Sequence, residues 1–221
     1  MDGTQALRPR TVRCVRQSLF RSIAGLPFAP RCYIAEVRFV AFLELMVCWF
    51  AWWYPFIFRA PHVQKRQSIT MATPTRIGLL LEGIGIAMAF IFRIQGDEAP
   101  GLIRILVSMA IAPIAPWMAW GAVKHLGRQF RVNAGLYHDH ELVQTGPYSI
   151  VRHPIYSSLM AIMVATLFLL TQWEWAIVAT AFYIVGTEIR VRTEDGLLAS
   201  RFGDHFEQYR RRVPAYIPWI R

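Results

Sequence analysis

Thr145-Gly-Pro-Tyr-Ser-Ile-Val-Arg-His-Pro-Ile-Tyr156 lies between a polar segment and an apolar run, and the rest of the chain is arranged around this stretch. Gly146-Pro147 predicts a turn. Pro154 suits the first position of a helix, where its missing N–H costs nothing, so His153 falls at the helix cap. A helix start offers unpaired N–H groups and a positive dipole end, which favour an anion. The stretch therefore indicates a polar pocket where water meets lipid.

The composition indicates an integral membrane protein. Of the 221 residues, 55% are hydrophobic, and the mean hydropathy of +0.32 is too high for an ordinary soluble domain. The formal net charge is +10. Because the arginines lie beside apolar runs, contact with anionic lipid is favoured over nucleic-acid binding. Cys14, Cys32 and Cys48 lack the spacing of a zinc site or a disulfide framework.

Five apolar runs predict membrane helices: residues 39–58, 77–92, 102–123, 155–170 and 175–186. Because only residues 171–174 separate the last two, they predict a tight antiparallel hairpin. Pro113 and Pro116 predict a kink in the third run. Small residues predict close helix contacts for the second run: Gly78, Gly83, Gly85 and Ala89. The predicted fold is an all-α integral membrane protein of about five transmembrane helices, with a C-terminal helical hairpin and a cytoplasmic cofactor pocket.

The chain divides into three parts by composition. Residues 1–38 form a basic N-terminal arm, predicted to be disordered or peripheral. Residues 39–123 hold three transmembrane helices, and residues 124–221 form the candidate catalytic region with a polar loop, the hairpin and an amphipathic tail. Lysines and arginines gather on the side of the polar loop and the C-terminus, which predicts that this side is cytoplasmic, at the inner membrane if the source is bacterial.

The tail carries an amphipathic pattern. After Gly186 the sequence becomes polar, and the last helix is expected to leave the membrane there. Leu198, Phe202, Phe206 and Tyr209 form an apolar stripe, predicted to lie on the bilayer or on the polar loop. Gly203 is expected to break the helix, with Asp204 capping a last short one. We expect this cationic tail to fold together with the stretch at residues 145–156.

Three motifs mark the second half of the chain: Gly146-Pro-Tyr148, Arg152-His-Pro154-x-Tyr156, and Arg190-x-x-x-Glu194-Asp195-x-x-Leu198 followed by Phe202-Gly203 and Tyr209. Together they resemble the isoprenylcysteine carboxyl methyltransferase family, over roughly residues 75–218. The resemblance implies an integral membrane enzyme that uses S-adenosylmethionine. The superfamily also includes phospholipid N-methyltransferases, so the motifs leave the acceptor open.

The resemblance also implies site residues. The family's cofactor contacts fall, by position, on His140, Glu141, Leu142, Val143, Tyr148, His153, Pro154, Ile155, Tyr156 and Glu194, with a further contact near Asn133. The family's substrate-carboxylate arginine falls on Arg190. The chain departs from the family at Asp195, which replaces the second Glu of an acidic pair, and at Gly196, which should loosen a helix by up to about 1 kcal/mol.

Arg190 and Glu194 are the candidate catalytic residues. Methyl transfer from a sulfonium to a carboxylate needs positioning and desolvation but no general base, because the acceptor is already ionised. Arg190 offers a planar fork that matches a carboxylate, and Glu194, one helical turn away, suits the amino or hydroxyl groups of the donor. The alternative is a plain surface ion pair, which stabilises a helix by only about 0.2–0.5 kcal/mol.

Other polar residues have simpler alternatives. His153 is interpreted either as a helix cap or as a cofactor contact. Tyr148 and Tyr156 are interpreted either as interfacial aromatics or as rings packed against the adenine or the sulfonium. His138 and His140, two residues apart with no Cys partner, are a weak ligand set, so we predict no metal site.

Glu44 and Glu82 lie inside apolar runs, where carboxylates are costly and usually face the interior of the helix bundle. Each is predicted to pair with a nearby Arg or polar group or to sit near an interface. A transport path is the alternative.

Three functions are compatible with the sequence. The first is methylation of an isoprenylcysteine-like carboxylate on a lipidic or prenylated substrate by S-adenosylmethionine. The second is N-methylation of a phospholipid or another amine, in which Arg190 would hold a phosphate. The third is non-catalytic lipid binding or transport, which would use Glu44 and Glu82. Binding of S-adenosylmethionine separates the third function from the other two.

Overall fold

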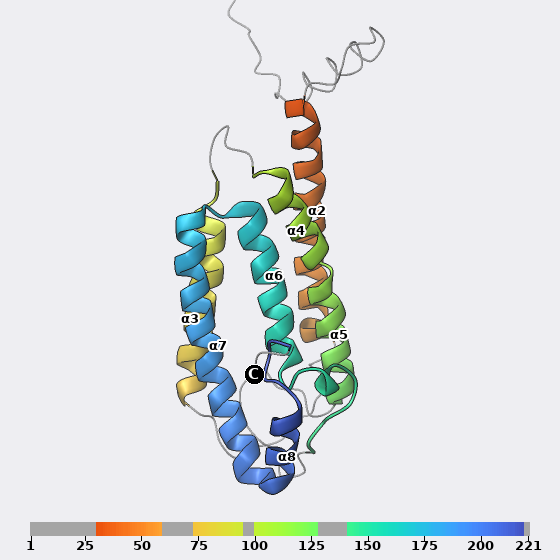
Figure 1. Ribbon diagram of the computed structural model, residues 1–221, viewed down its shortest axis with the longest axis vertical. Coiled ribbons are helices and arrows are strands. Elements are labelled where there is room, and N and C mark those ends of the chain that lie inside the picture. Colours follow the sequence, from red (N-terminus) through yellow and green to blue (C-terminus); the bar gives the residue numbers. More distant parts are fainter. Residues whose placement is uncertain (1–29, 59–72, 95–99, 128–140, 219–221) are drawn as a thin grey trace, which may run out of the picture. The chain divides into compact units, whose positions relative to one another are not determined.

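A computed structural model describes residues 30–58, 73–94, 100–127 and 141–218 (Figure 1). These residues are helical apart from connecting segments and one isolated β-bridge between Arg93 and Thr171. In chain order the helices are α2 (Pro30–Phe58), α3 (Thr73–Ile91), α4 (Leu102–Ile111), α5 (Ile114–Leu126), η3 (Gly146–Ser149), α6 (Pro154–Leu170), α7 (Trp173–Phe202) and α8 (Asp204–Arg212). The all-α class is confirmed for the described part of the chain. Asn133, His138, His140 and most of the basic arm lie outside it.

The chain separates into two compact units, Met1–Val40 and Ala41–Arg221. Of the first unit, the structure describes the beginning of α2, from Pro30 onward. The second unit holds the remaining helices and all the residues discussed below.

Within the described residues, three helices are long and apolar enough to cross a bilayer: Glu36–Phe58, Pro74–Ile91, and Leu102–Leu126, which includes α4 and α5. Helix α6 is apolar but has 17 residues. Helix α7 runs for 30 residues without interruption, through Gly196. The structure therefore supports a membrane protein with at least three spans, and the count of five stays a prediction.

The predicted kink occurs at Pro113. Helix α4 ends at Ile111 and α5 begins at Ile114, after Ala112 donates its N–H to the carbonyl of Ser108 at 2.9 Å. Pro113 has no N–H to continue the hydrogen-bond ladder, and its ring excludes a regular preceding turn. The physical reason for the break is therefore local.

Helices α3 and α7 lie side by side, as Figure 1 shows, in antiparallel contact. Two of the predicted small residues allow this approach. A Cβ at Gly78 would lie 2.7 Å from the carbonyl oxygen of Gly186, and a Cβ at Gly85 would lie 2.6 Å from that of Ala179. The prediction is wrong for Gly83, where a Cβ would meet nothing within 4 Å, because this residue faces away from α7.

Gly85→Ala is expected to lower the free energy of unfolding by about 1–3 kcal/mol, because its Cβ would force the backbones of α3 and α7 apart. Gly83→Ala, half a turn away on the same helix, is the matched control. It should be neutral or should stabilise the protein by up to about 1 kcal/mol through helix propensity. Denaturant titrations of both variants in detergent, followed by circular dichroism, measure the difference. Equal effects would contradict the close approach.

Helix α6 is anchored to its neighbours by polar contacts. Trp52 Nε1 donates to Ser158 Oγ at 2.9 Å, and Trp49 Nε1 donates to Thr166 Oγ1 at 3.0 Å. At its C-terminal end, Arg104 donates to the carbonyl oxygens of residues 167, 168 and 171. The bonds from Arg104 supply donors at a helix end, where carbonyl groups lack intrahelical partners and lipid offers none.

The tail differs from the prediction in one detail. Gly203, at φ +51°, separates α7 from α8 as expected, but it is Gly203 that occupies the cap position, and Asp204 is the first residue of α8 with no side-chain cap bond. Phe206 and Tyr209 are buried, and the Tyr209 hydroxyl donates to the carbonyl of Tyr148 at 2.5 Å. Of the two predicted locations for the apolar stripe, the polar loop is therefore correct for α8.

Candidate functional site

The stretch at residues 145–156 folds as a tight turn followed by the start of α6. Gly146 has φ +61°, and a Cβ there would lie 2.3 Å from the imidazole of His125. Both the positive φ and the contact favour glycine. Helix α6 begins with Pro154 at its first position and His153 at its cap, as predicted, but the His153 side chain makes no capping hydrogen bond. The interpretation of His153 as only a helix cap is therefore wrong.

The tail lies against this stretch. Arg152 and His153 donate their backbone N–H groups to the carbonyls of Pro214 and Ala215, each at 2.8 Å. Ser157 Oγ donates to the carbonyl of Tyr216 at 2.5 Å. These bonds confirm that the segment ahead of the hairpin and the cationic tail fold together.

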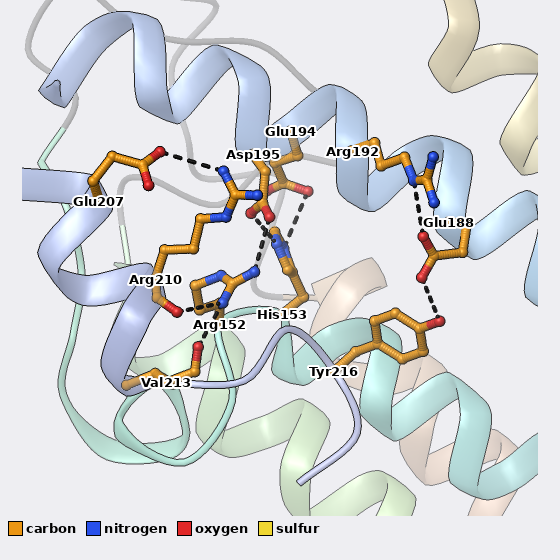
Figure 2. A network of polar contacts seen from close by, with 10 residues as sticks. All are labelled: Arg152, His153, Glu188, Arg192, Glu194, Asp195, Glu207, Arg210, Val213 and Tyr216. Carbon is orange, nitrogen blue, oxygen red and sulfur yellow. Dashed lines mark hydrogen bonds and ion pairs between the residues drawn. The ribbon is translucent and has the colours of Figure 1, made fainter. Parts of the chain in front are cut away.

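Asp195 joins the two regions through its side chain, as Figure 2 shows. Its Oδ2 accepts from Arg152 Nη2 at 2.9 Å, and its Oδ1 lies 2.8 Å from His153 Nε2. Arg152 also donates to the carbonyls of Val213, at 2.5 Å, and Arg210, at 3.2 Å. Burial by itself would raise the pKa of Asp195, but the hydrogen bonds and charges of His153 and Arg152 outweigh burial and lower this pKa below its ordinary value.

Glu194 is the open member of the acidic pair. Its side chain is 37% exposed, whereas that of Asp195 is 8% exposed. Its Oε2 accepts from the Tyr156 hydroxyl at 3.0 Å and lies 3.6 Å from His153 Nδ1. The imidazole of His153 thus lies between the two carboxylates, one enclosed by protein and one reachable from solvent (Figure 2).

Arg190 is buried, at 8% exposure, so the interpretation of Arg190 and Glu194 as a plain surface ion pair is wrong. Its Nη1 forms an ion pair with Glu82 Oε2 on α3, and its guanidinium carbon lies 4.7 Å from the centroid of the Tyr156 ring. Glu82 Oε1 also accepts from Thr187 Oγ1 at 2.9 Å. The prediction that Glu82 pairs with an Arg is confirmed.

Side-chain contacts bring four of the predicted site residues into one cluster: His153, Tyr156, Arg190 and Glu194. Tyr148 is buried beside it, and burial, with the nearby Glu194 and Tyr209, raises its pKa. Glu141, Leu142 and Val143 form a segment without helix ahead of η3, with Glu141 exposed. Within the described ranges, no hydrogen bond joins Glu141 to the cluster.

Several members of the network were not predicted. Arg152 and Asp195 form its buried centre, and Tyr216 Oη donates to Glu188 Oε1 at 2.9 Å where the tail crosses α7 (Figure 2). A signal existed for Arg152, since it adjoins His153 in a motif. No sequence signal identifies Tyr216 or Glu188, because these two hydrogen-bond partners lie 28 residues apart in the chain.

Comparison with known proteins finds relatives of this region. Residues 106–200 match the model of the isoprenylcysteine carboxyl methyltransferase (ICMT) family. The protein-S-isoprenylcysteine O-methyltransferase of Schizosaccharomyces pombe is 38% identical over 82 residues, covering 37% of this chain and 35% of that protein. The protein-S-isoprenylcysteine O-methyltransferase B of Arabidopsis thaliana is 34% identical over 84 residues, covering 37% and 41%.

A relative with a different kind of name has a similar sequence identity to this chain. The cobalt-zinc-cadmium resistance protein CzcN of Cupriavidus metallidurans is 40% identical over 78 residues, covering 35% of each chain. This chain thus aligns with about a third of the length of the curated relatives it matches. The family match spans the stretch at residues 145–156, the hairpin and the Arg190–Asp195 segment, and agrees with the motifs found there. The region of residues 106–200 is therefore similar to the isoprenylcysteine carboxyl methyltransferase family.

Proposed function

We propose that this protein is a membrane-bound O-methyltransferase that transfers a methyl group from S-adenosylmethionine to the carboxylate of an isoprenylcysteine-like lipidic substrate. One observation carries the proposal. The residues of the family match converge on a single polar cluster, in which a buried arginine, Arg190, and an open carboxylate, Glu194, flank Tyr156.

The cluster fits S-adenosylmethionine. Glu194 is partly exposed beside buried His153 and Tyr156, so its free oxygen can accept hydrogen bonds from amino or hydroxyl groups. Tyr156 presents an aromatic face, which attracts a cation. When bound, S-adenosylmethionine supplies an electrophilic methyl group on a cationic sulfur. His153, Tyr156 and Glu194 would hold it, together with Tyr148, Pro154, Ile155 and residues 140–143.

Arg190 would hold the acceptor. Its guanidinium presents several N–H donors, and a carboxylate can use two of them in parallel. A carboxylate acceptor is ionised at neutral pH, so this chain has to orient it and exclude water from it rather than deprotonate it. The burial of Arg190 serves both needs.

A lipidic acceptor also fits the apolar character of the spanning helices. The spanning helices expose large apolar side chains, such as Val47 and Phe50 on α2, as lipid-facing helices do. We propose that the lipid bilayer is the working environment, that a lipidic or prenylated molecule is the substrate, and that the C-terminus lies on the cytoplasmic side.

A labelled-methyl assay tests the proposal. Purified protein in detergent is mixed with methyl-labelled S-adenosylmethionine and either N-acetyl-S-farnesylcysteine or extracted membrane lipids. The expected product is a base-labile methyl ester formed from the farnesylcysteine. A base-stable product formed from lipids would instead favour N-methylation of an amine headgroup, and failure to bind S-adenosylmethionine would overturn methyl transfer altogether. Free fatty acids, a second class of lipidic carboxylate, belong in the acceptor panel.

A further inference from the structure

Helix α3 lies outside the region that matches the family, yet it supplies the ionic partner of Arg190. Glu82 is 1% exposed and sits near the middle of a helix long and apolar enough to cross a bilayer. A buried carboxylate at such a position is costly unless it is paired, and such residues usually face the interior of the helix bundle.

Both oxygens of Glu82 are engaged by α7. Oε1 accepts from Thr187, and Oε2 pairs with Arg190 Nη1. The carboxylate is thereby fixed at two points, so the direction from which it holds the guanidinium is fixed as well. A single contact would leave the fork free to rotate.

The backbone around this pair is shaped to admit it. A Cβ at Gly186 would lie 2.5 Å from the carbonyl of Gly78, 2.8 Å from the backbone nitrogen of Glu82 and 3.0 Å from its Cγ. A Cβ at Gly78 would lie 2.5 Å from Arg190 Cγ. Two glycines, one on each helix, thus make room for the carboxylate and for the stem of the arginine.

Glu82 holds an N–H at the edge of the guanidinium, and the Tyr156 ring, whose hydroxyl donates to Glu194, lies 4.7 Å from the guanidinium carbon. Glu82 and Tyr156 therefore clamp Arg190 from two sides, and Tyr156 links it to the cluster that would hold the methyl donor. An arginine clamped in this way keeps its planar fork in one orientation, and orientation is what two-point recognition of a carboxylate requires.

We propose that Glu82 is a positioning residue that orients Arg190 for the carboxylate of the acceptor and so determines the preference for an anionic over a neutral acceptor. This inference rests on the proposed function of Arg190. Glu82 acts through Arg190, so its loss should weaken binding of the acceptor and leave binding of S-adenosylmethionine unchanged.

The test compares two ligands that differ in one group: N-acetyl-S-farnesylcysteine, and the same compound with its carboxylate replaced by a carboxamide. Binding of each to wild-type protein in detergent is measured by calorimetry, and KM and kcat are measured for the carboxylate. The wild type should bind the carboxylate about tenfold or more tightly than the carboxamide, as expected for a charge-assisted pair.

In Glu82→Gln, this preference should fall to about threefold or less, with a matching rise in KM, a smaller change in kcat and an unchanged Kd for S-adenosylmethionine. Glu82→Asp, which keeps the charge, should recover part of the preference. Thr187→Val removes one of the two contacts of Glu82 and should cause an intermediate loss, which also keeps the test open if Glu82→Gln does not fold.

Glu44→Gln is the matched control, because Glu44 is a carboxylate in a different spanning helix, α2, and should leave the preference unchanged. If Glu82→Gln kept the wild-type preference for the carboxylate, or lost binding of both ligands equally, the role of Glu82 would be overturned. The acceptor assignment of Arg190 would not be affected by that result. A wild type that binds neither farnesyl ligand, or binds both equally, would overturn the acceptor assignment of Arg190 and, with it, this inference.

Discussion

Asp195→Ala is expected to lower the free energy of unfolding by about 3–5 kcal/mol, the range for removing one member of a buried ion pair. Asp195 accepts from Arg152 and His153, and the three side chains are 8%, 4% and 3% exposed. Removing the carboxylate leaves the Arg152 charge buried with only backbone carbonyls as partners. It also removes the side-chain link between α7, the start of α6 and the tail. Denaturant unfolding in detergent measures the loss.

Glu207→Ala is the matched control, because Glu207 forms an exposed ion pair with Arg210 in α8, with side chains 44% and 48% exposed. Its loss should cost less than about 1 kcal/mol. If both variants were equally stable, Asp195 would not be the structural centre that the geometry indicates.

The contribution of Asp195 should also depend on pH. The pKa of Asp195 is lowered in the folded protein, so at acidic pH this carboxyl binds fewer protons in the folded protein than in the unfolded chain. The contribution is therefore complete above the ordinary Asp pKa of about 4 and is lost as pH falls through the lower, folded-state value. Asp195→Asn keeps the shape without the charge, so the difference in stability between wild type and Asp195→Asn should shrink below about pH 4. A difference that grew on acidification would contradict this sign.

Arg190→Ala is expected to lower kcat/KM for methylation of a farnesylcysteine by about a hundredfold or more. Hydrogen bonds to charged groups contribute about 1.5–3 kcal/mol each, and loss of two of them corresponds to at least that factor. Arg190→Lys should be nearly as impaired, because a lysine keeps the charge but not the planar fork. Steady-state assays with labelled S-adenosylmethionine measure both variants.

Loss of activity in Arg190→Ala has a second possible cause, since the variant leaves Glu82 buried without its ion-pair partner. The double variant Glu82→Gln with Arg190→Met separates the two effects. Removing both charges should restore much of the stability, because a buried pair replaced by neutral groups is often close to neutral, while activity should stay lost. Arg192→Ala, two residues along α7 with a side chain 72% exposed, should keep wild-type activity. Recovery of activity in the double variant would show that Arg190 acts only by neutralising Glu82.

Local sequence features predicted much of the fold. The start of α6 at Pro154, the break at Pro113 and the end of α7 before Gly203 all follow from the backbone properties of proline and glycine. The same reasoning failed at Gly83, where the sequence pattern does not reveal which face of α3 meets α7. It also misplaced the cap of α8 by one residue, because Gly203 and Asp204 are both acceptable at a cap.

The site was predicted in part. The motifs marked His153, Tyr156, Arg190 and Glu194, and the structure places these side chains in one cluster. They did not predict that Asp195 would be its enclosed acid and Glu194 its open one, since the two residues are adjacent in the chain and their burial depends on the direction in which α7 turns each side chain.

By itself, the sequence determined the helical class, the membrane character, the boundaries of the helices near the site and the motifs that resemble the family. These depend on apolar run length and on proline and glycine, which act within a few neighbouring residues. Only the tertiary structure decided which acid meets which base. Glu82 and Arg190 are 108 residues apart, and Arg152 and Asp195 are 43 apart. Their pairing is decided by the packing of α3 on α7 and of the tail on the start of α6, because charges separated by this much chain meet only when the helices that carry them have packed.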